Sequence, residues 1–66
     1  MTVTVNGKQK DLATGCSLRQ LLEELNVSPA AIIVELNRKI LDRSEYETTV
    51  FQDGDRVELI RVVGGG

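Results

Sequence analysis

Histidine is absent from this chain of 66 residues, and cysteine, tyrosine and phenylalanine each occur once. Without histidine, the sequence lacks the usual general base near neutral pH and the commonest metal ligand in proteins. The single cysteine, Cys16, excludes an internal disulfide and a cysteine cluster that could bind a metal. Because Tyr46 and Phe51 are the two aromatic residues, we expect a core of valine, leucine and isoleucine.

Charge and hydropathy exclude two further classes of protein. The net charge is −2 and the sequence contains no basic run, which argues against binding of a nucleic-acid backbone. No apolar run approaches the length of about 18 residues that a membrane span requires. The N-terminus also lacks the basic and then apolar pattern of a signal peptide. We therefore expect a cytoplasmic protein with neither a nucleic-acid nor a membrane partner.

The first elements predicted are two strands joined by a tight turn. Residues 2–5 alternate polar and apolar side chains, which predicts a half-buried strand. Asn6-Gly7 follows, and this pair is typical of a hairpin turn because both residues tolerate positive φ. Residues 8–12 are then the returning strand, polar enough to lie at a sheet edge.

A helix is predicted after the hairpin. Ser17 and Gln20 have the spacing of a capping box at a helix N-terminus. Leucines at positions 18, 21, 22 and 25 form one apolar stripe at helical spacing. Asn26 can end the helix, and Ser28-Pro29 prevents its continuation.

The second half of the chain predicts more strands. Residues 31–34 form an apolar run, which together with residues 35–37 suits a central strand; residues 38–41 suit a short strand, and residues 42–46 an irregular or single-turn segment. Residues 48–51 are β-prone, Asp53-Gly54-Asp55 predicts a turn, and residues 56–63 predict the last strand. The order favours an α+β fold in which one helix packs on a mixed sheet of four to five strands.

Few residues invite a chemical role. We interpret Cys16 as a small, partly buried residue rather than a redox group, and the aspartates of the 53–55 turn as solvated rather than calcium ligands. The run Gly64-Gly65-Gly66 is different, because glycine has no side chain and can thread a narrow channel in any backbone conformation. Such a tail could carry a carboxylate into another protein's active site; the alternative is a frayed terminus.

These features together resemble the ubiquitin-like sulfur carrier proteins. The resemblance lies in the order of elements, the 53–55 turn, and the ending Val62-Val63-Gly64-Gly65-Gly66. The segments Glu35-Leu36-Asn37 and Ile40-Leu41-Asp42-Arg43, with Tyr46 following, are similar to the thiamine-pathway carriers, the ThiS family. Many members have alanine or serine in place of Gly64, and tryptophan in place of Tyr46.

The resemblance implies a β-grasp domain over residues 1–63 and a flexible glycine tail over residues 64–66. It also implies a carrier and not an enzyme. A ThiF-like adenylating enzyme would use ATP to adenylate the C-terminal carboxylate of Gly66, and sulfur from a cysteine desulfurase or similar donor would convert it to a thiocarboxylate. Thiazole synthase would then take the sulfur for the thiazole ring of thiamine. No cofactor or metal is expected on the carrier itself.

The resemblance also assigns roles near the tail. Gly64 and Gly65 would thread the partner's channel, and Val63 would help to position them. We expect partners to bind the exposed face of the last strand, at Leu59, Arg61 and Val63, and the free chain to be a monomer. Two alternatives stay open: a sister carrier for molybdopterin or tRNA thiolation, with a possible role as a protein modifier, and a non-covalent β-grasp binding module.

Overall fold

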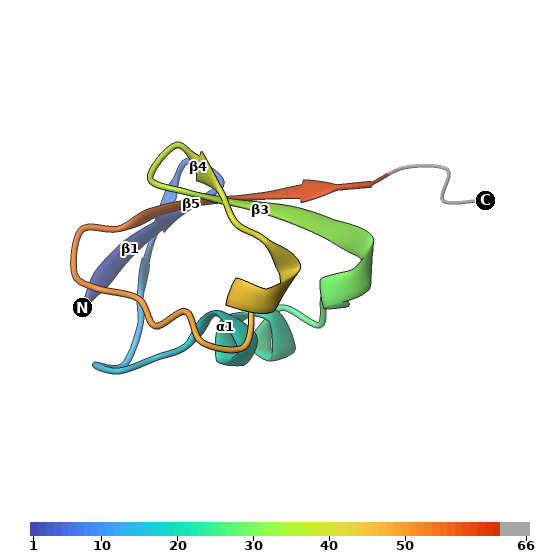
Figure 1. Cartoon of the computed structure of the whole chain (residues 1–66). Coiled ribbons are helices and arrows are strands. Elements are labelled where there is room, and N and C mark those ends of the chain that lie inside the picture. Colours follow the sequence, from blue (N-terminus) through green and yellow to red (C-terminus); the bar gives the residue numbers. More distant parts are fainter. Residues whose placement is uncertain (63–66) are drawn as a thin grey trace.

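A computed structural model describes residues 1–62 as a five-stranded mixed sheet with one α-helix on one side (Figure 1). The strands are β1 (Thr2–Val5), β2 (Lys8–Asp11), β3 (Ile32–Leu36), β4 (Lys39–Ile40) and β5 (Arg56–Arg61); the helix is α1 (Leu18–Glu24). Single 3₁₀ turns lie at η1 (Pro29–Ala31) and η2 (Arg43–Glu45). The predicted α+β class, with one helix on a mixed sheet, is confirmed.

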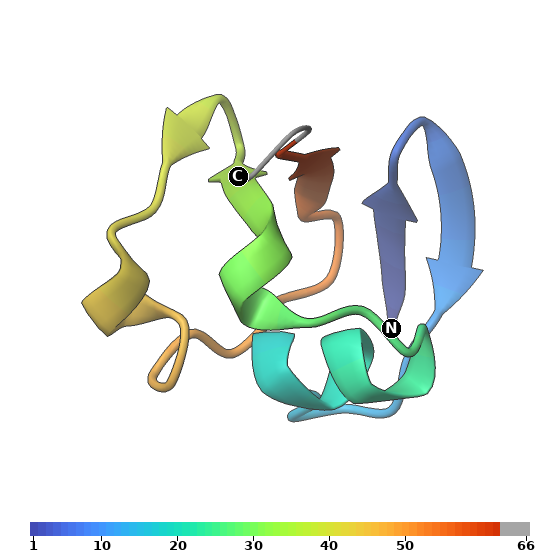
Figure 2. The same ribbon diagram turned by 90° about the vertical axis from the view of Figure 1, so that its right-hand side faces the viewer.

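The sheet has the order β2-β1-β5-β3-β4, which Figure 2 shows across the sheet with α1 beneath it. β5 is the central strand, parallel to β1 and antiparallel to β3. The predicted hairpin is confirmed, since Asn6 and Gly7 have φ values of 50° and 83° and β2 is an edge strand. The last strand of the sequence therefore lies in the middle of the fold, with a neighbour on each side.

Both predicted ends of the helix are confirmed. The Ser17 side chain accepts a hydrogen bond from the Gln20 N–H (3.1 Å), and the Gln20 side chain accepts one from the Ser17 N–H (2.9 Å). Asn26, at φ 59°, ends the helix, and the Val27 N–H donates to the Leu22 carbonyl (2.9 Å). The predicted apolar stripe is wrong at its last member, because Leu25 caps the helix and is 38% exposed.

Three of the predicted strands are longer than the strands in the structure. Ala31 belongs to η1, and β4 has two residues because Arg38 lies in the turn with a φ of 70°. The β-prone residues 48–51 contribute only an isolated bridge between Ser17 and Val50. β5 ends at Arg61, and the predicted end of the strand at residue 63 lies outside the described residues.

The core lies between the sheet and α1 and is mainly aliphatic, as composition predicts. Its fully buried side chains are Val3, Leu18, Leu21, Leu22, Ile32, Val34 and Val57. Tyr46 and Phe51 are buried in the same core cluster. Within residues 1–62, no helix has the length and hydropathy needed to cross a membrane.

Candidate functional site

The last strand before the C-terminal segment, β5, lies in the middle of the sheet. β5 is bonded to β1 and β3, and the ladder continues one residue beyond the strand, where the Val62 N–H donates to the Ala31 carbonyl (2.9 Å). Val62 is the last described residue. The predicted tail residues Val63, Gly64, Gly65 and Gly66 lie outside the described part of the chain, so their roles stay predictions.

The two sides of β5 differ in burial, and one residue that we predicted to bind a partner lies on the buried side. Val57 is fully buried, and Leu59, two residues on, is half-buried and packs against the core. Leu59 is therefore on the inner face and not on the exposed face where we predicted a partner to bind. Arg61 follows on the same inner face, opposite Ile32, but its side chain is exposed at the end of the strand. Both alternating sets of residues in this strand contain apolar side chains, so the sequence pattern did not distinguish the inner face from the outer one.

The outer face of the sheet, which is the side away from α1, carries exposed isoleucine and valine. Ile33 on β3 and Ile60 on β5 are directly opposite each other and are 38% and 47% exposed. Ile40 on β4 is 64% exposed, and Val62, at the root of the tail, is 46% exposed. We call Ile33, Ile40, Ile60 and Val62 the apolar patch. Sequence reasoning missed its three isoleucines, because only the pairing of distant strands brings them together.

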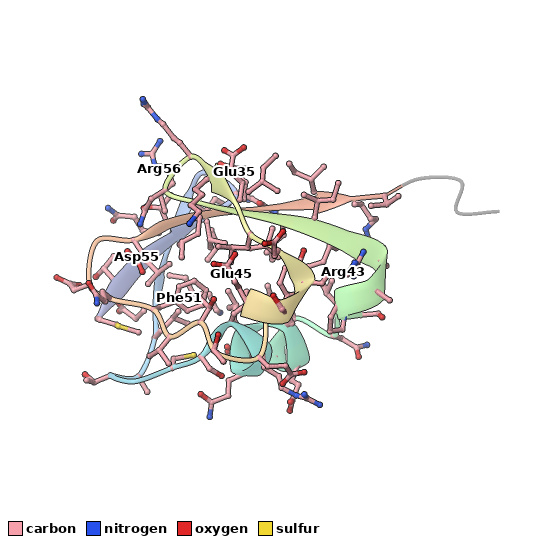
Figure 3. The ribbon with its side chains drawn as sticks, in the orientation of Figure 1. Glu35, Arg43, Glu45, Phe51, Asp55 and Arg56 are labelled. Carbon is pink, nitrogen blue, oxygen red and sulfur yellow. The ribbon has the colours of Figure 1, made fainter. Side chains whose placement is uncertain are left out.

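Two carboxylates lie beside the apolar patch. Glu35 on β3 is directly opposite Glu58 on β5, and both residues are half-buried; we call them the acidic pair. Figure 3 shows Glu35 and Arg56 on the outer side of the sheet, while Phe51 lies between sheet and helix. The outer face therefore combines an apolar surface with negative charge next to the root of the tail.

Asn37 fixes the register of the strands that carry this face. Its N–H donates to the Arg56 carbonyl (2.8 Å), and its side-chain oxygen accepts from the Arg56 N–H (2.9 Å). Its side-chain amide donates to the Asp55 carboxylate (3.0 Å). The asparagine that contributed to the family resemblance thus joins the end of β3 to the start of β5.

Arg43 and Tyr46 also have structural contacts. The Tyr46 hydroxyl accepts a hydrogen bond from the Val34 N–H (3.1 Å) and donates one to the Ile32 carbonyl (3.4 Å). The Arg43 guanidinium donates to the Pro29 carbonyl (2.8 Å), and its carbon lies 5.8 Å from the centre of the Tyr46 ring. These two side chains therefore tie η2 to β3 and η1.

Cys16 lies at the loop before the helix, where it is partly buried and packs against the core. Burial raises the pKa of its thiol, and the nearby Glu24 carboxylate raises it further. A raised pKa lowers the thiolate fraction near neutral pH, which is the opposite of what a nucleophilic or redox cysteine needs. The structural interpretation of Cys16 is thus supported.

Among the described residues, no group of three or more histidine, cysteine, aspartate or glutamate side chains is arranged so that it could bind a metal ion.

Comparisons with known proteins agree with this arrangement. The model of the ThiS family matches residues 3–66. The chain is 30% identical to the sulfur carrier protein ThiS of Escherichia coli (strain K12), with full coverage of both chains. It also matches the crystal structure of the thiamine biosynthesis protein (ThiS) from Geobacter metallireducens, with a TM-score of 0.83, 39% identity and full coverage of both. That likeness confirms the predicted ubiquitin-like β-grasp fold.

Two further relatives are longer proteins. The chain is 32% identical over 66 residues to the thiazole synthase of Paramagnetospirillum magneticum, and equally identical to that of Magnetococcus marinus. In each case it spans 20% of the length of the curated relative. In these relatives, a segment similar to the whole of this chain is thus part of a protein named thiazole synthase.

Proposed function

The chain belongs to the ThiS family, and from this we propose that it is a sulfur carrier of thiamine biosynthesis, whose residue Gly66 carries the transferred sulfur. The observation that carries the proposal is the family match over residues 3–66, which includes the terminal glycines. The full-length similarity to the carrier of Escherichia coli supports it. The proposed role is that of a carrier, with catalysis supplied by partner enzymes.

The proposed chemistry takes place at the carboxylate of Gly66. A carboxylate is a poor electrophile, so a ThiF-like partner would first join it to the α-phosphate of ATP and release pyrophosphate. AMP is a good leaving group, and sulfur delivered by a donor protein at the oxidation level of sulfide would displace it. The resulting thiocarboxylate would give its sulfur to thiazole synthase, and the carboxylate would be restored.

Tail length and tail composition suit this cycle. From Val63 to Gly66, an extended chain reaches about 13 Å from the last strand. Gly64 and Gly65 have no side chains, so a narrow channel could admit them in any backbone conformation. Partner enzymes would bind the globular domain at the apolar patch, beside Val62, while the tail enters the active site.

Relatives favour the thiamine pathway over the sister pathways. The family is ThiS, and the similar proteins described above are a sulfur carrier protein ThiS, a thiamine biosynthesis protein (ThiS) and two thiazole synthases. The two thiazole synthases that contain a similar segment support thiazole synthase as the partner that takes the sulfur. We therefore propose this chain as the sulfur donor to that enzyme.

Reconstitution with the host's adenylating enzyme, ATP and a sulfur source tests the proposal. We expect AMP release and a thiocarboxylate on Gly66, both abolished by Gly65→Val, because a branched side chain would obstruct the channel. Gly64→Ala is the matched control and should retain activity, since many family members have alanine there. Adenylation of Gly65→Val at the rate of the unsubstituted chain would contradict the threading role. Absence of a thiocarboxylate on the unsubstituted chain would contradict the carrier function.

A further inference from the structure

The acidic pair is an unfavourable arrangement for an isolated sheet. Glu35 and Glu58 are direct partners on β3 and β5. The backbone bonds at Asn37–Arg56 and Ala31–Val62 place the pair at a hydrogen-bonded position of the ladder, where Cα atoms are about 5.5 Å apart. Like charges directly opposite each other on one sheet face repel and destabilise the sheet. The fold thus has two half-buried carboxylates where neutral or apolar residues would be more stable.

No basic group within residues 1–62 forms an ion pair with either carboxylate. The ion pairs of that part of the chain join Lys10 to Glu24 and Arg19 to Glu23 and Glu47. Arg56 is on the same face, two residues before Glu58, but its guanidinium is not within 4.0 Å of either acidic side chain. The charge of the acidic pair is therefore left for solvent or for another molecule to balance.

The surroundings of the acidic pair determine which partner group suits it. The pair Ile33–Ile60 is the next pair on this face, toward the C-terminal end of β5, and Ile40 is opposite Glu35 on the other side. A protein that covers the apolar patch would remove water from the acidic pair as well. Two adjacent carboxylates without water need a cation, and an arginine or lysine can bind both through charge-assisted hydrogen bonds.

We infer that the outer face of the sheet docks on a surface of thiazole synthase that presents apolar side chains around an arginine or lysine, which binds between Glu35 and Glu58. The inference rests on the proposed function and names the chemistry of its partner surface. One observation selects thiazole synthase as the occupant, and a second places the contact beside the tail. A similar segment is part of the thiazole synthase chain in two relatives, and the face is continuous with Val62 at the root of the sulfur-bearing tail.

The test measures stability and affinity on the same variants. In Glu35→Gln/Glu58→Gln, the repulsion is removed, so the melting temperature should rise by about 2–4 °C. The affinity for the host's purified thiazole synthase, measured by titration calorimetry at low salt, should fall about tenfold. Binding by the unsubstituted chain should weaken more with added salt than binding by the variant. A rise in stability together with a loss of affinity separates a docking role from a folding defect.

Glu23→Gln/Glu24→Gln is the matched control, because it changes the net charge equally on the helix side, where both residues are exposed. It should bind thiazole synthase with unchanged affinity. If Glu35→Gln/Glu58→Gln binds as tightly as the unsubstituted chain, or loses affinity only for the adenylating enzyme, the inference is wrong. The carrier function still stands in that case if the unsubstituted chain forms the thiocarboxylate. Failure of the unsubstituted chain to bind thiazole synthase would overturn the inference and the assignment to the thiamine pathway, while formation of the thiocarboxylate separately tests the carrier function.

Discussion

Residues in left-handed backbone conformation mark the ends of several elements in this chain. Asn6 at the first hairpin, Asn26 at the end of α1 and Asn37 after β3 have φ values of 50°, 59° and 50°. Asparagine tolerates this region better than most residues, so the first two positions were predictable from the sequence. Arg38, at φ 70°, was not, because arginine has no preference for left-handed backbone.

We predict that Arg38→Gly stabilises the fold. A left-handed conformation costs a residue with a Cβ atom about 1–2 kcal/mol. Glycine avoids this cost but loses about 0.5–1 kcal/mol through the entropy of the unfolded chain. The free energy of unfolding in urea should therefore rise by about 0.5–1 kcal/mol. Arg38→Ala is the control and should show no gain, since it keeps the Cβ atom. Equal stabilities of the glycine and alanine variants would contradict the strain at this position.

Along the edge of β3 that faces β4, part of the backbone is hydrogen-bonded by groups that do not belong to a strand. β4 pairs only with Glu35 and Leu36, at the end of β3. Beyond β4, the Leu41 N–H donates to the Val34 carbonyl (2.9 Å), and the Tyr46 hydroxyl binds the Val34 N–H and the Ile32 carbonyl. One phenol thus takes the place that a longer β4 would occupy.

Tyr46→Phe should weaken this edge. The substitution leaves the buried Val34 N–H without a partner, which costs about 1–3 kcal/mol of unfolding free energy. Hydrogen exchange of the Val34 amide should accelerate more than exchange in β1. Arg43→Gln serves as control, because its contacts are on the exposed side and should contribute less than about 1 kcal/mol. Unchanged stability and unchanged exchange at Val34 would show that water replaces the hydroxyl.

Local signals determined which elements were predictable. The Asn6-Gly7 turn and the Ser17 capping box depend on residues close in sequence, and both were predicted correctly. β5 was predicted as a strand, but its inner face was not, because Leu59 and Ile60 are equally apolar. Only packing under α1 selects Val57 and Leu59 for the inner side. Long-range contacts thus supplied what local sequence could not.

At the scale of the whole molecule, the sheet divides the chain into two sides. One side holds the aliphatic core under α1, and the other presents the apolar patch and the acidic pair beside the root of the tail. The apolar patch was not predictable from the sequence, because Ile33 and Ile60 are far apart in sequence and meet only through the pairing of β3 with β5.

Ile60→Asp tests the apolar patch as a docking surface. The charge should raise the KM for this chain in the adenylation reaction at least about tenfold, because an apolar contact is replaced by a desolvated carboxylate. Stability should fall by about 1 kcal/mol, because the side chain is 47% exposed but the added carboxylate shares its sheet face with the acidic pair, so KM is compared at a temperature where the variant is folded. Val50→Asp is the matched control: Val50 is 53% exposed and bridges to Ser17 at the start of the helix, away from the patch. Equal KM values for both variants would contradict docking at the patch.

The most direct test of the carrier function is the intact mass of the protein isolated from its host, followed by mapping of its C-terminal fragment. We expect a fraction heavier by the exchange of one oxygen for one sulfur, with the extra mass localised to Gly66. This fraction should disappear when the host's adenylating enzyme is deleted. An unmodified Gly66 in the host, and also after incubation with ATP, the adenylating enzyme and a sulfur source, would contradict the account.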